Sequence, residues 1–145
     1  MAENKKSLLA EFSRKAMQRL QAKKAHKKQV LHVPSLEQDI TIRSLTYNEI
    51  AECNEIDDST DRGRSDKYGV YLAMVEPDLR AAAKEIMEAE ADLPPEERTL
   101  HEPLDIMNIF EIFELNQIAA AVMKLSGVIG GQGKDVTAVK ELKNS

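Results

Sequence analysis

Near the start of the chain, apolar residues recur every four positions: Leu8, Phe12, Ala16 and Leu20. This spacing places them on one side of an α-helix. We therefore predict a helix over residues 7–25, with Ser7 as its N-cap. The apolar stripe is narrow, and the other positions are mostly Lys, Arg and Gln. Because such a helix is marginal alone in water, it is expected to need a partner surface or to be partly disordered.

The hydrophobic period changes over residues 29–44. Ile40 and Ile42 alternate with polar residues, a pattern typical of a strand with one buried face. A shorter apolar run over residues 30–33 precedes them, and residues 34–38 have the composition of a turn. The pattern predicts a β-hairpin. An isolated hairpin is barely stable, so this one must lie on the helices or pair with the edge of another chain.

Helical signals return after the hairpin. Thr46 and Glu49 match the capping box, in which each side chain accepts a hydrogen bond from the other residue's amide. A polar segment over residues 57–66 is expected to be an exposed loop. Two further helices are predicted, over residues 67–75 and 79–91, and they end at Pro77 and Pro94.

Residues 103–125 are the most apolar part of the chain. On one straight helix, Ile106, Ile109, Phe110 and Phe113 would lie nearly opposite Leu115, Ile118, Val122 and Leu125. Such a helix would have to be buried on both sides. A break near Phe113 to Leu115, giving two short helices that face one core, explains the pattern more simply. Gly127 then suits the left-handed residue that ends the last helix.

These elements predict an α+β fold that is mainly α. A small N-terminal β-hairpin packs on a bundle of about four or five short helices. With 145 residues, 42% apolar and 31% charged, the chain suits one domain with tails. We divide it into a basic helical arm (1–28), a folded domain (29–128) and a flexible polar tail (129–145).

Charge is distributed unevenly along the chain. Residues 1–28 carry nine basic and two acidic side chains, whereas the whole chain has a net charge of −5. The arm is therefore +7 and the remainder −12. A basic arm can bind nucleic acid, and a small nucleic-acid-associated regulator is our alternative reading. The acidic remainder and the 4% aromatic content argue against it, so the favoured reading is an arm that is solvated or that docks on the acidic body of another copy, and a homo-oligomer is expected.

Neither a membrane span nor a secretory signal is evident in the sequence, so a cytoplasmic location, without membrane association, is expected. Cys53 is the single cysteine and can form no internal disulfide. The segment 130–135 lacks the Ser or Thr of a phosphate loop, and residues 57–69 lack the Glu that closes a calcium loop. His26, His32 and His101 have no metal-ligand spacing. The sequence therefore predicts a protein without catalytic residues, cofactor or metal.

Four short motifs resemble one protein family. They are Ile-Arg-Ser-Leu-Thr-Tyr-Asn-Glu (42–49), Met-Val-Glu-Pro-Asp-Leu (74–79), Pro-Leu-Asp-Ile (103–106) and the helix from Glu114 to Gly127. Their order over residues 38–128 resembles the phage tail assembly chaperones of the XkdN-like type, from phages and prophages of Gram-positive bacteria. The chain departs from that family in having Phe113 where Gly is frequent, and in its basic arm.

The resemblance implies a function. Such chaperones coat the long, helical tape measure protein before the tail tube forms, help to recruit tail tube protein, and are absent from the finished virion. The chain resembles the short product of a frameshifted pair and would act in the host bacterial cytoplasm. The motif positions expected to be structural are Leu45, Thr46, Glu49, Glu76, Pro77, Asp78, Glu114, Leu115, Ile118, Leu125 and Gly127.

The last helix also offers a candidate docking face. We assign its stripe at Leu115, Ile118, Val122 and Leu125 to the core. The neighbouring face around Phe113, Asn116 and Met123 is then predicted to bind the partner, because methionine and aromatic side chains make adaptable apolar contacts.

Overall fold

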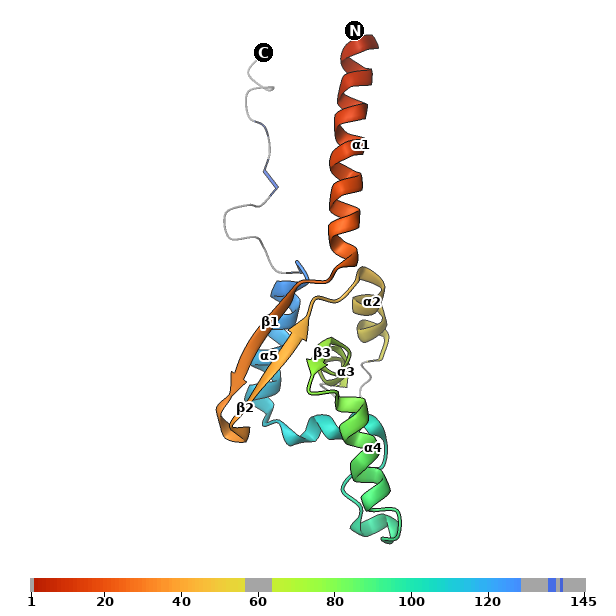
Figure 1. The fold of residues 1–145 in the computed structure, drawn as a ribbon, viewed down its shortest axis with the longest axis vertical. Coiled ribbons are helices and arrows are strands. Elements are labelled where there is room, and N and C mark those ends of the chain that lie inside the picture. Colours follow the sequence, from red (N-terminus) through yellow and green to blue (C-terminus); the bar gives the residue numbers. More distant parts are fainter. Residues whose placement is uncertain (1, 57–63, 129–135, 138, 140–145) are drawn as a thin grey trace.

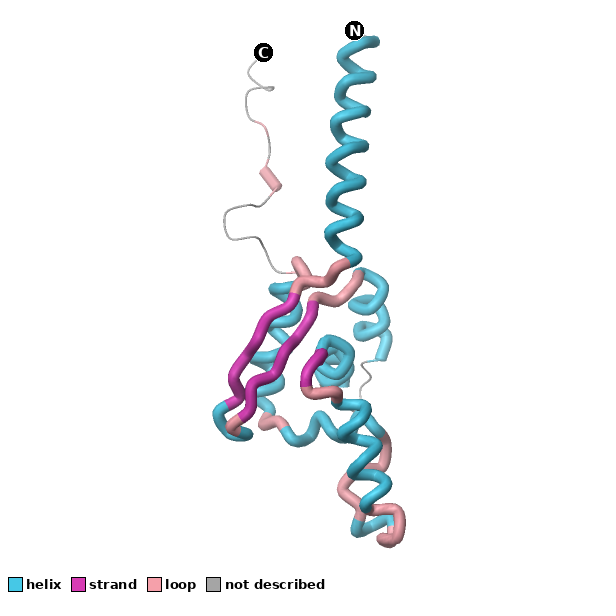
Figure 2. Tube along the Cα trace, viewed as in Figure 1, coloured by secondary structure: helices cyan, strands magenta, loops and turns pink. Residues whose placement is uncertain are grey.

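The computed structural model describes residues 2–56, 64–128, 136, 137 and 139. As predicted, the fold is α+β and mainly α (Figures 1 and 2). The elements are α1 (Ala2–Lys24), β1 (Lys28–Val33), η1 (Pro34–Leu36), β2 (Gln38–Arg43), α2 (Tyr47–Ile56), α3 (Arg64–Ala73), β3 (Met74–Glu76), α4 (Leu79–Ala89), η2 (Pro95–Glu97), η3 (Pro103–Ile109) and α5 (Ile112–Leu125).

Helix α1 extends away from the rest of the described molecule (Figure 1). It begins at Ala2, five residues earlier than predicted, so Ser7 lies inside the helix and the N-cap prediction is wrong. The apolar side chains of its stripe, Leu8, Phe12 and Leu20, are each more than 60% exposed. Among the described residues, no surface covers this stripe.

The hairpin is formed by β1 and β2, whose antiparallel register pairs Lys28 with Arg43 and Val33 with Gln38. The third strand, β3, pairs antiparallel with β2 through an irregular register. Sequence periodicity assigned Met74 and Val75 to a helix, which is wrong. A three-residue strand is too short to display alternation, and its pairing with β2 is what defines it.

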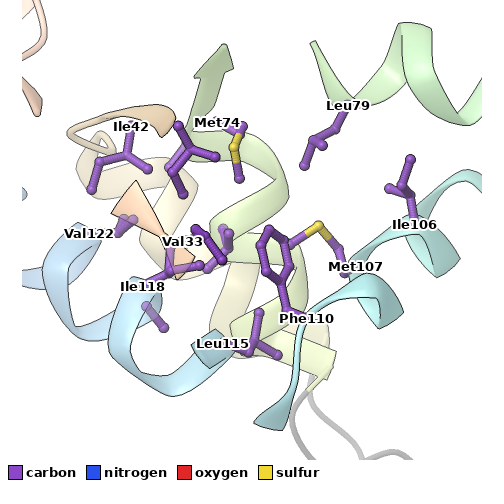
Figure 3. Packing of buried hydrophobic residues seen from close by; sticks show 14 of the residues in the cluster. Val33, Ile42, Met74, Leu79, Ile106, Met107, Phe110, Leu115, Ile118 and Val122 are labelled. Carbon is purple, nitrogen blue, oxygen red and sulfur yellow. The ribbon is translucent and has the colours of Figure 1, made fainter. Parts of the chain in front are cut away.

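The break in the last apolar segment is confirmed, a few residues before the predicted position. The 3₁₀ helix η3 and helix α5 meet at an angle of 110° around Phe110 and Glu111. Both therefore direct their apolar sides into one core, where Met107 of η3 and Phe110, which follows η3, lie in one cluster with Leu115 and Ile118 of α5 (Figure 3).

The predicted caps are present at the start of α2 and at the end of α5. Thr46 Oγ1 accepts from the Glu49 amide at 3.2 Å, and Glu49 Oε1 accepts from the Thr46 amide at 2.9 Å, so the capping box is present. Gly127 has φ 79°. Its amide donates to the Lys124 carbonyl and the Val128 amide donates to the Met123 carbonyl, the two bonds of a Schellman cap.

Helix α3 begins at Arg64, so it takes in the end of the segment predicted to be a loop over residues 57–66. The rest of that predicted loop, with most of the residues tested for a calcium loop, lies outside the described residues, as do the glycine-rich link and most of the tail at 129–145. Among the helices that the structure describes, no single one has the length and apolar character to span a membrane, and only the bent pair η3–α5 passes that test jointly.

Candidate protein-binding groove

A groove lies between the far end of β1 and the first half of α5. Its volume is about 470 Å³. The lining side chains are mostly apolar: Leu31, Val33, Pro34, Phe113, Ile118 and Ala121, with His32, Ser35, Glu114 and Gln117 among them. We call it the β1–α5 groove. A cleft of this size and composition suits an apolar side-chain cluster of a partner.

Strand alternation builds one wall of the groove. Leu31 and Val33 share the inner face of the hairpin with Ile40, which pairs with Leu31. Val33 and Ile40 are buried, whereas Leu31 is half-buried because it reaches the open groove. Val30 and His32 belong to the outer face, and both are exposed. The period-two pattern of the sequence is therefore the cause of this wall.

One buried carboxylate in the groove lining, that of Glu114, connects the two sides of the groove. Glu114 Oε2 accepts from Ser35 Oγ of η1 at 2.5 Å, and its Oε1 accepts from the Glu111 amide at 2.8 Å. The hydrogen bond from Ser35 holds the pKa of Glu114 below its usual range, and the Glu111 amide adds to the effect. Glu114 therefore stays ionised and joins the hairpin turn to the start of α5.

Large apolar side chains stand at the mouth of the groove. Phe113 lines it and is 60% exposed, and the adjacent Ile112 is 80% exposed. Both lie in the first turn of α5, directly after the bend from η3. The bend directs Phe110 into the core and leaves Phe113 on the surface, so the same break supplies both a core residue and an exposed one.

The structure does not place the three predicted docking residues in one site. Phe113 lies in the groove, and Asn116 is exposed on another side of α5. Met123 is half-buried against the core, where its Cε would lie 3.9 Å from a Cβ added at Gly69 of α3. Of the three, Phe113 has the position of a docking residue.

The motif positions of the resemblance occupy caps and core. Leu45, Leu115 and Ile118 are buried, and Leu125 is half-buried. Asp78 caps α4, because its Oδ1 accepts from the amides of Arg80 and Ala81 at 3.0 and 3.2 Å. Glu76 pairs with Thr41, and Pro77 links β3 to this cap.

Glu49 has a second contact. Arg43 donates to its two oxygens, at 2.9 Å to Oε1 and 2.8 Å to Oε2. The Arg43 hydrogen bonds lower the pKa of Glu49 to about 2, although partial burial opposes the shift. The pair joins the end of β2 to the first turn of α2.

The residues with possible ligand chemistry stand apart from the groove or have other partners. Within the described residues, no three His, Cys, Asp or Glu side chains converge on a possible metal position. His26 Nδ1 lies 2.9 Å from the Ser44 carbonyl oxygen, and His32 Nδ1 lies 2.6 Å from Asp39 Oδ1. Cys53 is buried, and burial raises the pKa of its thiol, so it stays protonated and unreactive at neutral pH.

Sequence reasoning did not find the groove. Leu31 and Pro34 are far from Gln117 in the sequence, and only the packing of the hairpin on α5 brings them together. The one available signal was a large aromatic residue, Phe113, outside the stripe Leu115, Ile118, Val122 and Leu125 that was assigned to the core. Comparison with protein-family models, curated proteins and solved structures finds no match for this chain.

Proposed function

We propose that the chain is a phage tail assembly chaperone that binds apolar helical segments of a tape measure protein in the β1–α5 groove. The observation that carries the proposal is the open, apolar groove with Phe113 at its mouth. An amphipathic helix can lay its apolar face into such a groove. The resemblance of four sequence motifs to those of tail assembly chaperones supports the proposal, and the groove offers a surface of suitable chemistry for a client.

The physical task fits this surface. A tape measure protein presents long apolar helical stripes before the tube encloses them, and exposed apolar surface of that kind aggregates. A groove of about 470 Å³ takes a few side chains, so each contact is weak. Many copies bound along one long chain give high total coverage and release their client easily when tube subunits replace them.

Co-expression tests the proposal. The probe is a tape measure protein co-expressed with the chain, and the measurement is its soluble fraction with wild type, Phe113→Asp or Tyr47→Asp. Tyr47 is 90% exposed on α2 and lines no part of the groove, so it is the matched control. We expect wild type and Tyr47→Asp to keep the client soluble and Phe113→Asp to lose most of this effect. A client that is equally soluble with all three proteins, or insoluble with all three, would refute the proposal.

A further inference from the structure

Helix α1 carries a wider apolar surface than its four-residue repeat suggests. Leu9 and Met17 are 67% and 57% exposed and lie beside the repeat on the helix, at positions one residue after Leu8 and Ala16. We define the α1 stripe as the set Leu8, Leu9, Phe12, Ala16, Met17 and Leu20. Its core follows the i, i+3, i+7, i+8, i+11 spacing of a helix that packs on a surface. Such a stripe favours a covered position.

The link between α1 and β1 sets where that position is. Lys27 donates its amide to Ser44 Oγ at 2.9 Å and accepts from the Ser44 amide at 2.8 Å. The His26 ring contacts the Ser44 carbonyl oxygen, and His26 holds a left-handed φ of 36°. These contacts direct α1 away from the hairpin (Figure 1). In this arrangement the α1 stripe lies away from the groove of its own chain.

Size complementarity points to the β1–α5 groove. The stripe from Leu9 to Leu20 is about 16 Å long at 1.5 Å per helical residue. The groove follows α5 from Phe113 to Ala121, about 12 Å by the same rise, and β1 from Leu31 to Val33, about 7 Å, before it continues along η1. Phe12 and Met17 would then meet Leu31 and Phe113, a set with two aromatic rings and one flexible methionine.

Charge selects the same groove. Helix α1 carries seven Lys or Arg side chains against two Glu. Among the described residues that line the β1–α5 groove, none is Lys or Arg and one is the carboxylate Glu114. The exposed carboxylates Glu37 and Glu111 follow and precede the lining residues Ser35 and Phe113 closely in the sequence. A second hollow, lined by residues of α3, α4 and η3, presents Arg80 and Lys84 against the single carboxylate Glu88, so it suits a basic helix less well. Opposite charges steer association and suppress wrong sites.

We infer that α1 of one copy docks in the β1–α5 groove of a second copy, so that the chain covers its own client site until a client displaces the helix. Docking of α1 in the groove follows from the exposure, length and charge described above, whereas its displacement by a client rests on the proposed function. Reciprocal docking of two chains would bury two stripes and two grooves.

A mixing experiment tests the inference. Phe12→Asp disables the α1 stripe and leaves the groove intact, whereas Phe113→Asp disables the groove and leaves α1 intact. Both side chains are at least 60% exposed, so neither change disturbs the core. By sedimentation velocity at low salt, we expect each variant alone to associate at least tenfold more weakly than wild type. An equimolar mixture should recover association, because one intact helix then meets one intact groove.

Gln18→Asp and Tyr47→Asp are the controls. Gln18 lies opposite the α1 stripe on the helix, so Gln18→Asp adds the same charge as Phe12→Asp without changing the stripe. Both controls should associate like wild type. Association lost in Phe12→Asp but kept in Phe113→Asp would show that helices pair with helices and would overturn the inference. A mixture that stays dissociated, or a monomeric wild type, would also overturn it. Client capture is measured separately, so the proposed function stands or falls by its own experiment.

Discussion

At the residue scale, two carboxylates hold the hairpin to the helices. Glu49 binds Arg43 through both oxygens, and Glu114 joins η1 to the start of α5. A bidentate pair between Arg and a carboxylate has fixed geometry and is stronger than a neutral hydrogen bond. These contacts explain why the chain can orient a hairpin over a short helix with few aromatic side chains.

The Arg43–Glu49 pair predicts a defined pH dependence. Because the pKa of Glu49 is lowered from 4.5 to about 2 in the folded state, its contribution to stability is complete above pH 4.5 and is lost as the pH falls toward 2. We expect Glu49→Gln to lower the denaturation midpoint at pH 7 and the difference from wild type to shrink below pH 4.5. Urea denaturation of both proteins across this range measures it. A difference that grows on acidification would contradict the assignment.

Ile118 and Met123 of α5 both contact the core, Ile118 as a buried residue and Met123 as a half-buried one. Ile118 is 4% exposed, so Ile118→Ala should cost about 2–5 kcal/mol of unfolding free energy, the range for large-to-small changes in a packed interior. Met123 packs on the core near Gly69, so Met123→Asp should destabilise as well by placing a charge there. Chemical denaturation of both variants provides the test. If Met123→Asp is as stable as wild type, Met123 belongs to the docking face and not to the core.

At the element scale, α5 is held to the hairpin at both ends. Ser35 reaches Glu114 at its start, and the Leu45 amide donates to Ser126 Oγ at its end at 2.8 Å. Ser126 Oγ itself donates to the Val122 carbonyl. The walls of the β1–α5 groove are thus two elements held in a fixed relation, which pre-organises the groove for a partner.

The Ser126 contact predicts a modest and specific loss. Ser126→Ala removes the acceptor of the Leu45 amide, so we expect about 0.5–1.5 kcal/mol lower unfolding free energy. Ser126→Thr keeps a hydroxyl and should retain more of the stability. Thermal unfolding compares the two variants. Equal loss in both would show that side-chain volume, and not the hydrogen bond, matters at this position.

Sequence periodicity predicted the elements whose cause is local. The alternation of Ile40 and Ile42 gave the hairpin, Thr46 and Glu49 gave the start of α2, and the two opposed apolar sides gave the break before α5. It missed β3, which exists through pairing with β2, and the groove, which exists through packing of α5 on β1. Those features depend on contacts between distant residues, which one sequence does not display.

At the scale of the whole molecule, α1 and the body are separate in structure. The contacts of Lys27 and His26 with Ser44 belong to the base of the hairpin, and α1 ends before them at Lys24. A deletion of residues 1–24 should therefore leave cooperative unfolding and the midpoint of the body nearly unchanged. Circular dichroism during thermal unfolding measures both. Loss of the cooperative transition would show that α1 belongs to the core.

The central claim is that the β1–α5 groove holds an apolar helix of the client. A photo-crosslinking amino acid at position 113, with the same group at position 47 as control, tests it most directly in the full chain co-expressed with the tape measure protein. The account predicts crosslinks from position 113 to apolar helical segments of the client, identified by mass spectrometry, and few or none from position 47. Crosslinks that favour position 47, or a position 113 that never reaches the client, would contradict it.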